Sequence, residues 1–274
     1  MIACVAAAVL CCPLMAQTKP GKKKILAIGQ VQGFQHDSVS HALATIEQLG
    51  RKTGLWDTYI RTDSQLLTKK KLEGNAKNLT YFDAVVFYTT GELPLDESQK
   101  ADLLSFVKED GKGFIGIHSA TDTFYQWPEY GELIGGYFDQ HPWNTFDAPV
   151  IVEDPSFPGM SQFPKEFVIK DEIYQYKSYS RDNVRVLMRL DASKLDLSNP
   201  RVHRTDGDFP VGWVKTYGKG RVYYSNLGHR EETWDREDIQ QMWIEGIKWA
   251  LGMTEGDTAS RPLSATGGST NKKR

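Results

Sequence analysis

The sequence contains 274 residues, of which 40% are hydrophobic, and it has a formal net charge of −2 at pH 7. A chain of this length can form one large domain with a hydrophobic core of its own. The charge near zero and the lack of a basic stripe argue against nucleic acid as a partner.

The N-terminal segment differs in composition from the rest of the chain. Residues 1–17 carry no charged side chain, and this apolar run is shorter than the roughly 20 residues of a membrane span. The run ends in small residues before a basic stretch, which predicts a signal peptide over residues 1–16 and a periplasmic or secreted bacterial protein. A buried N-terminal helix is the alternative. No later run approaches membrane-spanning length, so we expect no membrane span after cleavage.

All three cysteines of the chain, Cys4, Cys11 and Cys12, lie within this predicted signal peptide. The mature protein is therefore expected to contain no thiol. This excludes a disulfide framework, a cysteine nucleophile and a cysteine-ligated zinc ion. Any chemistry would have to rest on histidines, carboxylates and hydroxyl groups.

The first half of the remaining chain predicts alternating strands and helices. Short apolar runs indicate buried strands, and alternating apolar and polar residues indicate a further one. Two segments have helical spacing, and Asp96 is the predicted N-cap of the second. The predicted strands are Lys24–Gly29, Trp56–Thr62, Phe82–Thr89 and Gly113–His118, and the predicted helices are Ser38–Leu49 and Leu95–Asp110. This order predicts βαβ units around a parallel sheet, in which ligands bind at the carboxyl ends of the strands.

The second half has short alternating segments that predict antiparallel strands and a final helix. A glycine-rich turn between two of these segments predicts a β-hairpin. The predicted strands are Val150–Glu153, Phe167–Lys170, Asp171–Lys177, Val184–Leu190, Gly212–Tyr217 and Arg221–Ser225, and the helix is Asp238–Leu251. No linker divides the chain, so we expect one domain over residues 22–252 and a disordered tail over residues 253–274, where apolar residues are few.

Four of the six histidines lie in or beside glycine-containing turns near predicted strand ends: His36, His118, His141 and His229. Neutral imidazole is the commonest metal ligand and also the natural acid–base group near pH 7. Two or three of these residues with a carboxylate would form a zinc or manganese site with an open position. Because their spacing is no compact motif, plain loops and structural histidines are the alternative. His41 and His203 are predicted to lie on the surface.

The segment from His118 to Asp122 resembles the strand-to-helix turn on which α/β hydrolases and amidotransferases place a nucleophile. His118 occupies the exposed position of this turn and Ser119 follows it. Besides a metal-binding or acid–base role for His118, the pattern leaves open Ser119 as a nucleophile with His229 as its base.

Aromatic residues are frequent in the loops around these histidines. Stacking on aromatic faces binds the apolar face of a sugar ring, while carboxylates bind its hydroxyl groups. We therefore regard Phe34, Tyr125, Trp127 and Trp143, together with the carboxylate of Glu231, as candidate sugar-binding residues. The alternative is that most of these rings belong to the core.

Several blocks of the chain resemble the ThuA (trehalose-utilisation-like) family, in the same order. They read GIHSATDTFYQWPEYGELIGGYFDQHP from Gly116, DEIYQYK from Asp171, PVGWVKTYGKGRVYYSNLGHREETW from Pro210 and IEGIKWALG from Ile244. The resemblance covers residues 24–252. It implies an α/β fold of the flavodoxin-like, class I glutamine-amidotransferase-like type: a parallel sheet flanked by helices, with β-hairpins added in the second half.

The resemblance also implies where the pocket lies. In the amidotransferases the exposed turn carries a cysteine and a histidine follows a later strand; here these positions hold His118 and His229. Without the thiol we expect no glutaminase activity, and no nucleotide cofactor is expected. The family is associated with the uptake and oxidation of disaccharides such as trehalose, in which 3-keto sugars arise.

From these observations we expect an exported enzyme of carbohydrate metabolism, a metal- or histidine-dependent hydrolase or lyase of oxidised glycosides. His118, His141 and His229 would be ligands or acid–base groups, supported by His36, Asp122, Glu172 and Glu231. A non-catalytic carbohydrate-binding domain is the first alternative, and a structural module attached to an envelope enzyme is the second. The expected ligand is a small sugar, and a homo-oligomer is compatible with the sequence.

Overall fold

The computed structural model describes residues 21–74 and 76–263. The predicted signal peptide, residues 1–16, lies outside the described residues. In the part of the chain that is described, no helix is both long enough and apolar enough to cross a membrane.

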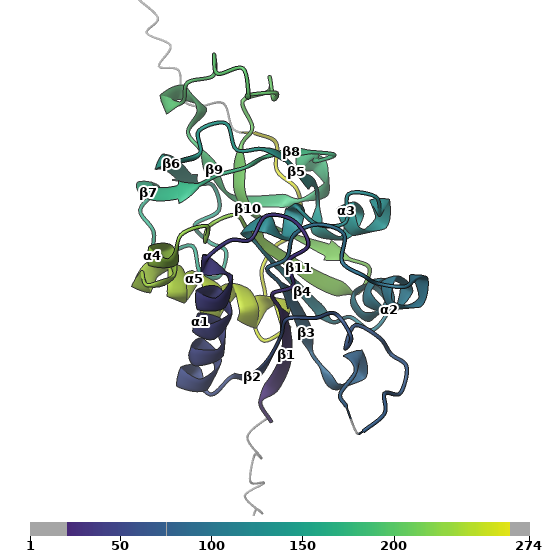
Figure 1. Cartoon of the computed structure of the whole chain (residues 1–274). Helices are drawn as coiled ribbons and strands as arrows, with labels where there is room; N and C mark the ends of the chain where they lie inside the picture. Colours follow the sequence, from purple (N-terminus) through teal and green to yellow (C-terminus); the bar gives the residue numbers. More distant parts are fainter. Residues whose placement is uncertain (1–20, 75, 264–274) are drawn as a thin grey trace, which may run out of the picture.

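A mixed sheet of nine strands forms the centre of the fold (Figure 1). One half is parallel and the other half continues it with antiparallel strands. The parallel half contains, in spatial order, β2 (Trp56–Arg61), β1 (Lys23–Ile28), β3 (Ala84–Phe87), β4 (Gly113–Ile117) and β11 (Gly220–Ser225). The antiparallel half contains β10 (Pro210–Tyr217), β9 (Arg185–Leu190), β6 (Thr145–Val152) and β7 (Glu166–Glu172). The expected α/β fold class, with added β-hairpins in its second half, is confirmed.

Helices cover both faces of the parallel half (Figure 1). One face carries α1 (Ser38–Thr53), α4 (Glu231–Trp234) and α5 (Glu237–Ala250), and the other carries α2 (Glu97–Lys108) and α3 (Pro128–Ile134). The predicted N-cap Asp96 accepts a hydrogen bond from the backbone N–H of Gln99 and forms a capping box. Helix α1 ends at Gly54, whose φ of 70° is left-handed and therefore suits glycine.

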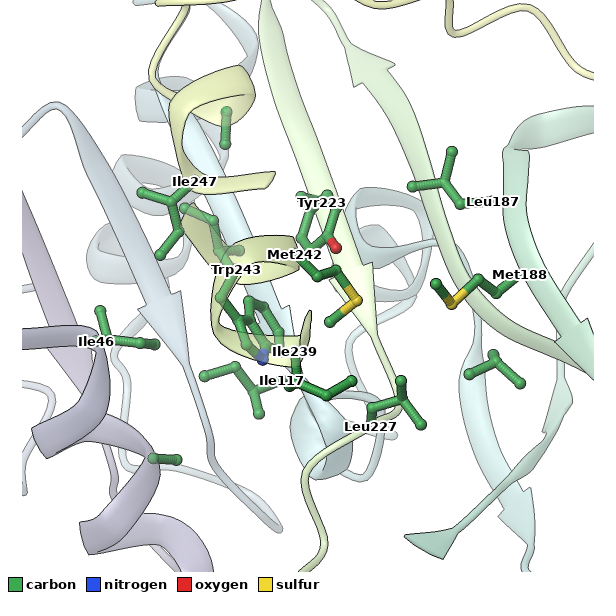
Figure 2. Packing of buried hydrophobic residues seen from close by; sticks show 14 of the residues in the cluster. Ile46, Ile117, Leu187, Met188, Tyr223, Leu227, Ile239, Met242, Trp243 and Ile247 are labelled. Atoms are coloured by element: carbon green, nitrogen blue, oxygen red, sulfur yellow. The ribbon is translucent and has the colours of Figure 1, made fainter. Parts of the chain in front are cut away.

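Two hydrophobic clusters fill the space between the sheet and these helices. Figure 2 shows the cluster beneath α5, where Met242 and Trp243 of the helix pack near Tyr223 of β11 and Ile117 of β4. The rings of Trp234 and Trp243 stack with centroids 5.1 Å apart. This packing fixes the carboxyl ends of β4 and β11, from which two of the candidate histidines project.

The prediction from sequence misplaced or missed several elements of the second half. The predicted strand Asp171–Lys177 is wrong, because β7 ends at Glu172 and β8 (Gln175–Lys177) pairs instead with β5 (Tyr137–Gln140) in a separate two-stranded sheet. The chain turns between them at Ile173 and Tyr174, and the backbone N–H of Tyr174 donates to the side chain of Asn226. Neither β5 nor α3 was predicted.

The chain beyond residue 252, where the tail was expected to start, makes defined contacts with the domain. Arg185 is 1% exposed and donates to Asp154 at 2.6 Å and to Asp257 at 2.7 Å. Arg221 contacts Glu255 at 2.9 Å, and Arg261 lies 3.7 Å from Asp154. The packed part of the chain therefore extends past residue 252 to Arg261. Residues 264–274 of the predicted tail lie outside the described residues.

Candidate functional site

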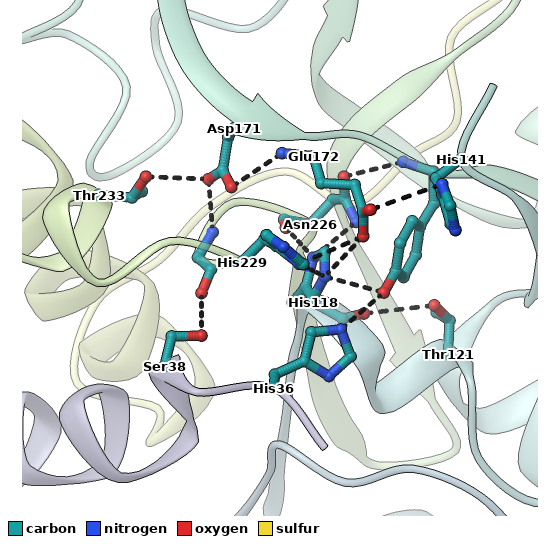
Figure 3. Close-up of polar contacts among 12 residues, drawn as sticks. His36, Ser38, His118, Thr121, His141, Asp171, Glu172, Asn226, His229 and Thr233 are labelled. Atoms are coloured by element: carbon teal, nitrogen blue, oxygen red, sulfur yellow. Dashed lines mark hydrogen bonds and ion pairs between the residues drawn. The ribbon is translucent and has the colours of Figure 1, made fainter. Parts of the chain in front are cut away.

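Four side chains from widely separated parts of the sequence converge beside the carboxyl ends of the parallel strands (Figure 3). They are His36 from the loop after β1, His118 after β4, His229 after β11, and Glu172 at the end of β7. One donor atom from each of them lies within 4.8 Å of the others. Three imidazole nitrogens and one carboxylate oxygen form a donor set of the kind that holds zinc or manganese.

His118 is held in an orientation that directs one ring nitrogen into this group. Its φ of 42° is unusual for a residue other than glycine, and it begins a 3-10 turn, His118–Thr121, directly after β4. Nδ1 lies 2.7 Å from the carbonyl oxygen of Asn226, which can only accept, so Nδ1 carries the proton. The lone pair of Nε2 therefore faces the group, which is how a second hydrogen bond orients a metal-binding histidine.

Glu172 supplies the negative charge of the group. Its Oε2 lies 3.2 Å from Nδ1 of His229 and 3.5 Å from Nε2 of His118, and its Oε1 lies 3.5 Å from Nδ1 of His141. Burial alone would raise the pKa of Glu172, but its interactions with His118 and His229 outweigh burial and lower it. The carboxylate is therefore ionised near neutral pH.

The pKa values of His36 and His229 are shifted in opposite directions. Burial, together with the nearby His118 and His229, lowers the pKa of His36 to about 2, so its imidazole is neutral. Burial also opposes the charging of His229, but the hydrogen bond and charge of Glu172 outweigh this effect and raise its pKa. Nδ1 of His36 is buried and has no hydrogen-bond partner among the described residues. The nitrogen that faces the donor group is Nε2, which lies 3.3 Å from the hydroxyl of Tyr174. In a neutral imidazole with its proton on Nδ1, Nε2 keeps a lone pair that can bind an ion.

Asp171, the neighbour of Glu172, connects two parts of this group. It is fully buried, and its Oδ2 accepts the backbone N–H of Gly228 at 2.8 Å and the hydroxyl of Thr233 at 3.1 Å. Its Oδ1 accepts the backbone N–H of Glu172 at 2.9 Å. Asp171 thereby fixes both the backbone of one donor residue and the loop that carries His229.

The carbonyl group of Gly228 is fixed from the other side. It accepts hydrogen bonds from Ser38 at 2.9 Å, Tyr88 at 3.0 Å and the indole of Trp234 at 3.0 Å. Ser38 begins α1 two residues after His36, and Tyr88 follows β3. The peptide that precedes His229 is therefore bound to three other elements of the fold, and we call Asp171, Gly228, Ser38, Tyr88 and Trp234 the Gly228 clamp.

A pocket of about 310 Å³ opens over the donor group. Phe34, at its rim, is 65% exposed, and Phe138 stacks on His141 with centroids 5.8 Å apart. Asp122 also lines the pocket and accepts a hydrogen bond from the hydroxyl of Tyr125; burial raises the pKa of this carboxyl group. The lining consists of Phe34, His36, Asp122, Phe138, His141, Glu172, Tyr174 and His229.

Several of the predicted site residues lie elsewhere. Trp127 packs in the core against Phe124 and Tyr130, and Trp143 packs against Phe146 and Phe209. Other candidates outside this lining are Tyr125, which lines a different cavity, and the exposed Glu231 of α4. Of the two remaining histidines, His41 lies on α1 beside Asp235, and His203 is half-exposed beside Asp139.

Ser119 is fully buried, and its hydroxyl has no hydrogen-bond partner among the described residues. The hydrogen bond from Ser119 to His229 that a serine nucleophile requires is therefore not formed in this structure. The geometry favours the histidines and Glu172 over Ser119 as the reactive group.

Tyr174, Phe138 and Asp171 were missed as functional residues. Tyr174 lies 2.8 Å from Nε2 of His118 through its hydroxyl and also lines the pocket. The segment Asp171–Lys177 was interpreted as one strand, in which alternate residues face opposite sides. This alternation places Glu172 and Tyr174 on one face and Asp171 on the other. It does not reveal that the chain leaves the central sheet at Glu172, or that Tyr174 reaches His118 from the turn before β8.

Comparisons with known proteins agree with this architecture. Residues 24–250 match the family described as ThuA, trehalose utilisation. A ThuA-like protein from Bacteroides uniformis is 22% identical, with a TM-score of 0.66 over 86% of this chain and 94% of its own. One from Parabacteroides merdae is 17% identical, with a TM-score of 0.66 over 88% of this chain and 97% of its own. A cytoplasmic protein from Salmonella typhimurium is 12% identical, with a TM-score of 0.53 over 83% of this chain and 99% of its own. No curated protein matches the chain. The structural similarities show the fold, and the family description points to carbohydrate metabolism.

Proposed function

The chain belongs to the ThuA family, described as trehalose utilisation, and we propose from this premise that it is a metal-dependent enzyme acting on sugars. His36, His118, Glu172 and His229 would hold one divalent ion, zinc or manganese. The observation that carries this proposal is the convergence of four donor atoms within 4.8 Å under a pocket. Three imidazoles with one ionised carboxylate suit such an ion.

The size and lining of the pocket support a sugar as the ligand. A volume of about 310 Å³ accommodates one sugar ring with its substituent, at the small end of ligand pockets. Phe34 and Phe138 offer apolar surface to a ring face, while Asp122 and His141 offer polar atoms to hydroxyl groups. These residues come from the loop after β1, from β5 and from the loops that follow β4 and β5.

We propose elimination from an oxidised glycoside as the reaction. An ion held by these residues would supply Lewis acidity to the carbonyl oxygen of a keto sugar. A keto group acidifies the neighbouring C–H, and Asp122 would accept that proton; its raised pKa suits a general base. The C–H electron pair would form a carbon–carbon double bond while the glycosidic oxygen leaves with its bonding pair. His141 would donate a proton to that oxygen. Hydrolysis would require a water molecule to add to the product.

Export of the protein is part of the proposal. The uncharged apolar composition of residues 1–16 and the basic residues that follow support a signal peptide and a periplasmic or secreted location. The sugar would then be encountered outside the cytoplasm. N-terminal sequencing of the protein isolated from culture tests this, since export predicts a chain that begins after residue 16.

A non-catalytic carbohydrate-binding domain is the second candidate. It is favoured by the hydroxyl of Tyr174, which lies 2.8 Å from Nε2 of His118 and satisfies the nitrogen that would otherwise bind an ion. The exposed ring of Phe34 also suits a binding platform. This candidate predicts sugar binding that is independent of metal and tolerant of Asp122→Asn.

Turnover of paired glycosides distinguishes the two candidates. Protein loaded with zinc or manganese is incubated with 3-keto glycosides and with the same glycosides unoxidised, and release of the leaving group is measured. The enzyme proposal predicts release from the keto sugars alone, lost in Asp122→Asn and retained in His203→Ala, a matched change of a histidine outside the pocket. Binding of these sugars without turnover would contradict the enzyme proposal and favour the second candidate.

A further inference from the structure

A second cavity of about 430 Å³ lies outside the metal-binding group. It is formed by α3, by β8 and the residue that follows it, and by β10, with Tyr125, Tyr137, Lys177, Ser178, Asn183 and Lys215 among its lining residues. None of the four metal-donor residues lines it. The proposed sugar chemistry makes no use of this cavity, and it therefore needs an explanation of its own.

Two lysines, Lys177 and Lys215, line this cavity. Among the described residues, neither Lys177 nor Lys215 forms an ion pair. Lys215 donates to the backbone carbonyl of Glu132 at 2.5 Å, and Lys177 lies over the ring of Tyr125, with its nitrogen 4.5 Å from the centroid. Both cations are therefore positioned by neutral groups. Burial lowers the pKa of Lys215, so a bound anion would stabilise its charged form.

Backbone strain gives an independent reason to regard this cavity as functional. Among the described residues, four other than glycine have positive φ. Two of them lie at this cavity: Phe124 at 57°, directly before Tyr125, and Ser178 at 52°, directly after Lys177. A third, His118, lies in the metal-binding group. Such conformations cost of order 1–3 kcal/mol each and concentrate at functional sites.

We propose that this cavity is a binding site for a small anionic molecule, whose carboxylate or phosphate group is held between Lys177 and Lys215. Ser178 and Asn183 add neutral hydrogen-bond donors to the two cations. Glu132 contributes a negative charge to the lining, so the two lysines leave a net positive charge. Charge-assisted hydrogen bonds from two positioned ammonium groups are the usual way to bind such an anion.

The hydroxyl of Tyr125 connects this cavity with the metal pocket. It donates to Asp122, which lines that pocket, while the Tyr125 ring carries Lys177 on its face. An anion bound to Lys177 therefore contacts a chain of three residues that ends at Asp122, in the lining of the metal pocket. The anion site itself does not depend on the proposed enzymatic function.

Calorimetric titration of the full-length mature protein tests the site. The probes are inorganic phosphate, glucose 6-phosphate and D-glucuronate, with uncharged D-glucose as the control ligand. The variants are Lys177→Met and Lys215→Met, which keep most of the apolar stem, and Lys52→Met is a matched control on the exposed end of α1.

We expect the wild type to bind at least one anionic probe but not glucose, and salt to weaken the binding. Each cavity variant should bind about tenfold or more weakly, as expected for loss of a charged hydrogen bond, and Lys52→Met should bind like the wild type. Binding of both phosphates would identify the phosphate group as the ligand, and binding of glucuronate alone would identify a carboxylate. The proposal is overturned if the wild type binds no anionic probe, or if both cavity variants bind as tightly as Lys52→Met.

Discussion

Replacing Asp171 by asparagine tests whether the Gly228 clamp positions the metal-binding group. The change keeps the size of the side chain but turns one acceptor oxygen into an NH2 donor. At Oδ2 this donor would face the N–H of Gly228, and at Oδ1 it would face the N–H of Glu172. Either orientation leaves a buried donor without its partner, which costs about 1–3 kcal/mol.

The effect on metal affinity follows from what Asp171 holds in place. It fixes the backbone of Glu172 and the peptide before His229, so both donor atoms should move relative to His118. Loss of such a supporting hydrogen bond weakens metal binding by roughly 10–100-fold. The zinc dissociation constant is measured by competition with a chromophoric chelator, and the stability of the metal-free protein by urea unfolding.

The matched control is Asp154→Asn, which changes another buried carboxylate, one paired with Arg185 and not part of the pocket lining. It should lower stability and leave zinc affinity unchanged. If Asp171→Asn lowers stability while its zinc dissociation constant equals that of the wild type, Asp171 has a purely structural role and the positioning argument is refuted.

Two further predictions concern stability and sugar binding. Burial alone would raise the pKa of Asp154, but its ion pair with Arg185 outweighs burial and lowers it. The pair therefore stabilises the fold at pH values above the pKa of Asp in the unfolded chain, about 3.9. This contribution is lost as the pH falls through the pKa of the folded state. In urea unfolding across this acid range, the free energy of unfolding should fall more steeply with decreasing pH in the wild type than in Asp154→Asn. Parallel pH dependences of the two proteins would contradict this prediction. Phe34→Ala should weaken binding of a sugar ligand, measured by calorimetry, without changing urea unfolding, because this ring is 65% exposed; unchanged affinity would remove Phe34 from the binding surface.

The parallel half of the fold could be predicted because its strands are short apolar runs that are buried on both faces. The runs ending near Gly29 and His118 end at the same edge of the sheet, as parallel strands must. The antiparallel half was harder to predict, since Asp171–Lys177 alternates like a strand although the chain turns at Tyr174. Nothing in its local pattern reveals that Tyr174 reaches His118 from the turn between the two sheets.

The convergence of side chains was harder to predict than the strands that carry them. Turns that end strands indicated the loops of His36, His118 and His229, but only the folded chain brings them within reach of Glu172. Aromatic rings gave the weakest signal, because packing rather than residue type decides their place. Trp127 and Phe34 have similar chemistry, yet one is in the core and the other at the rim of the pocket.

Metal content of the purified protein tests the central claim most directly. Elemental analysis without added metal would compare the wild type with His118→Ala, Glu172→Gln and the control His203→Ala, with circular dichroism to verify folding. The account predicts about one zinc or manganese ion per chain in the wild type and in His203→Ala, and loss of that ion in the other two variants. A wild-type protein that contains no metal and takes up none on reconstitution would contradict it.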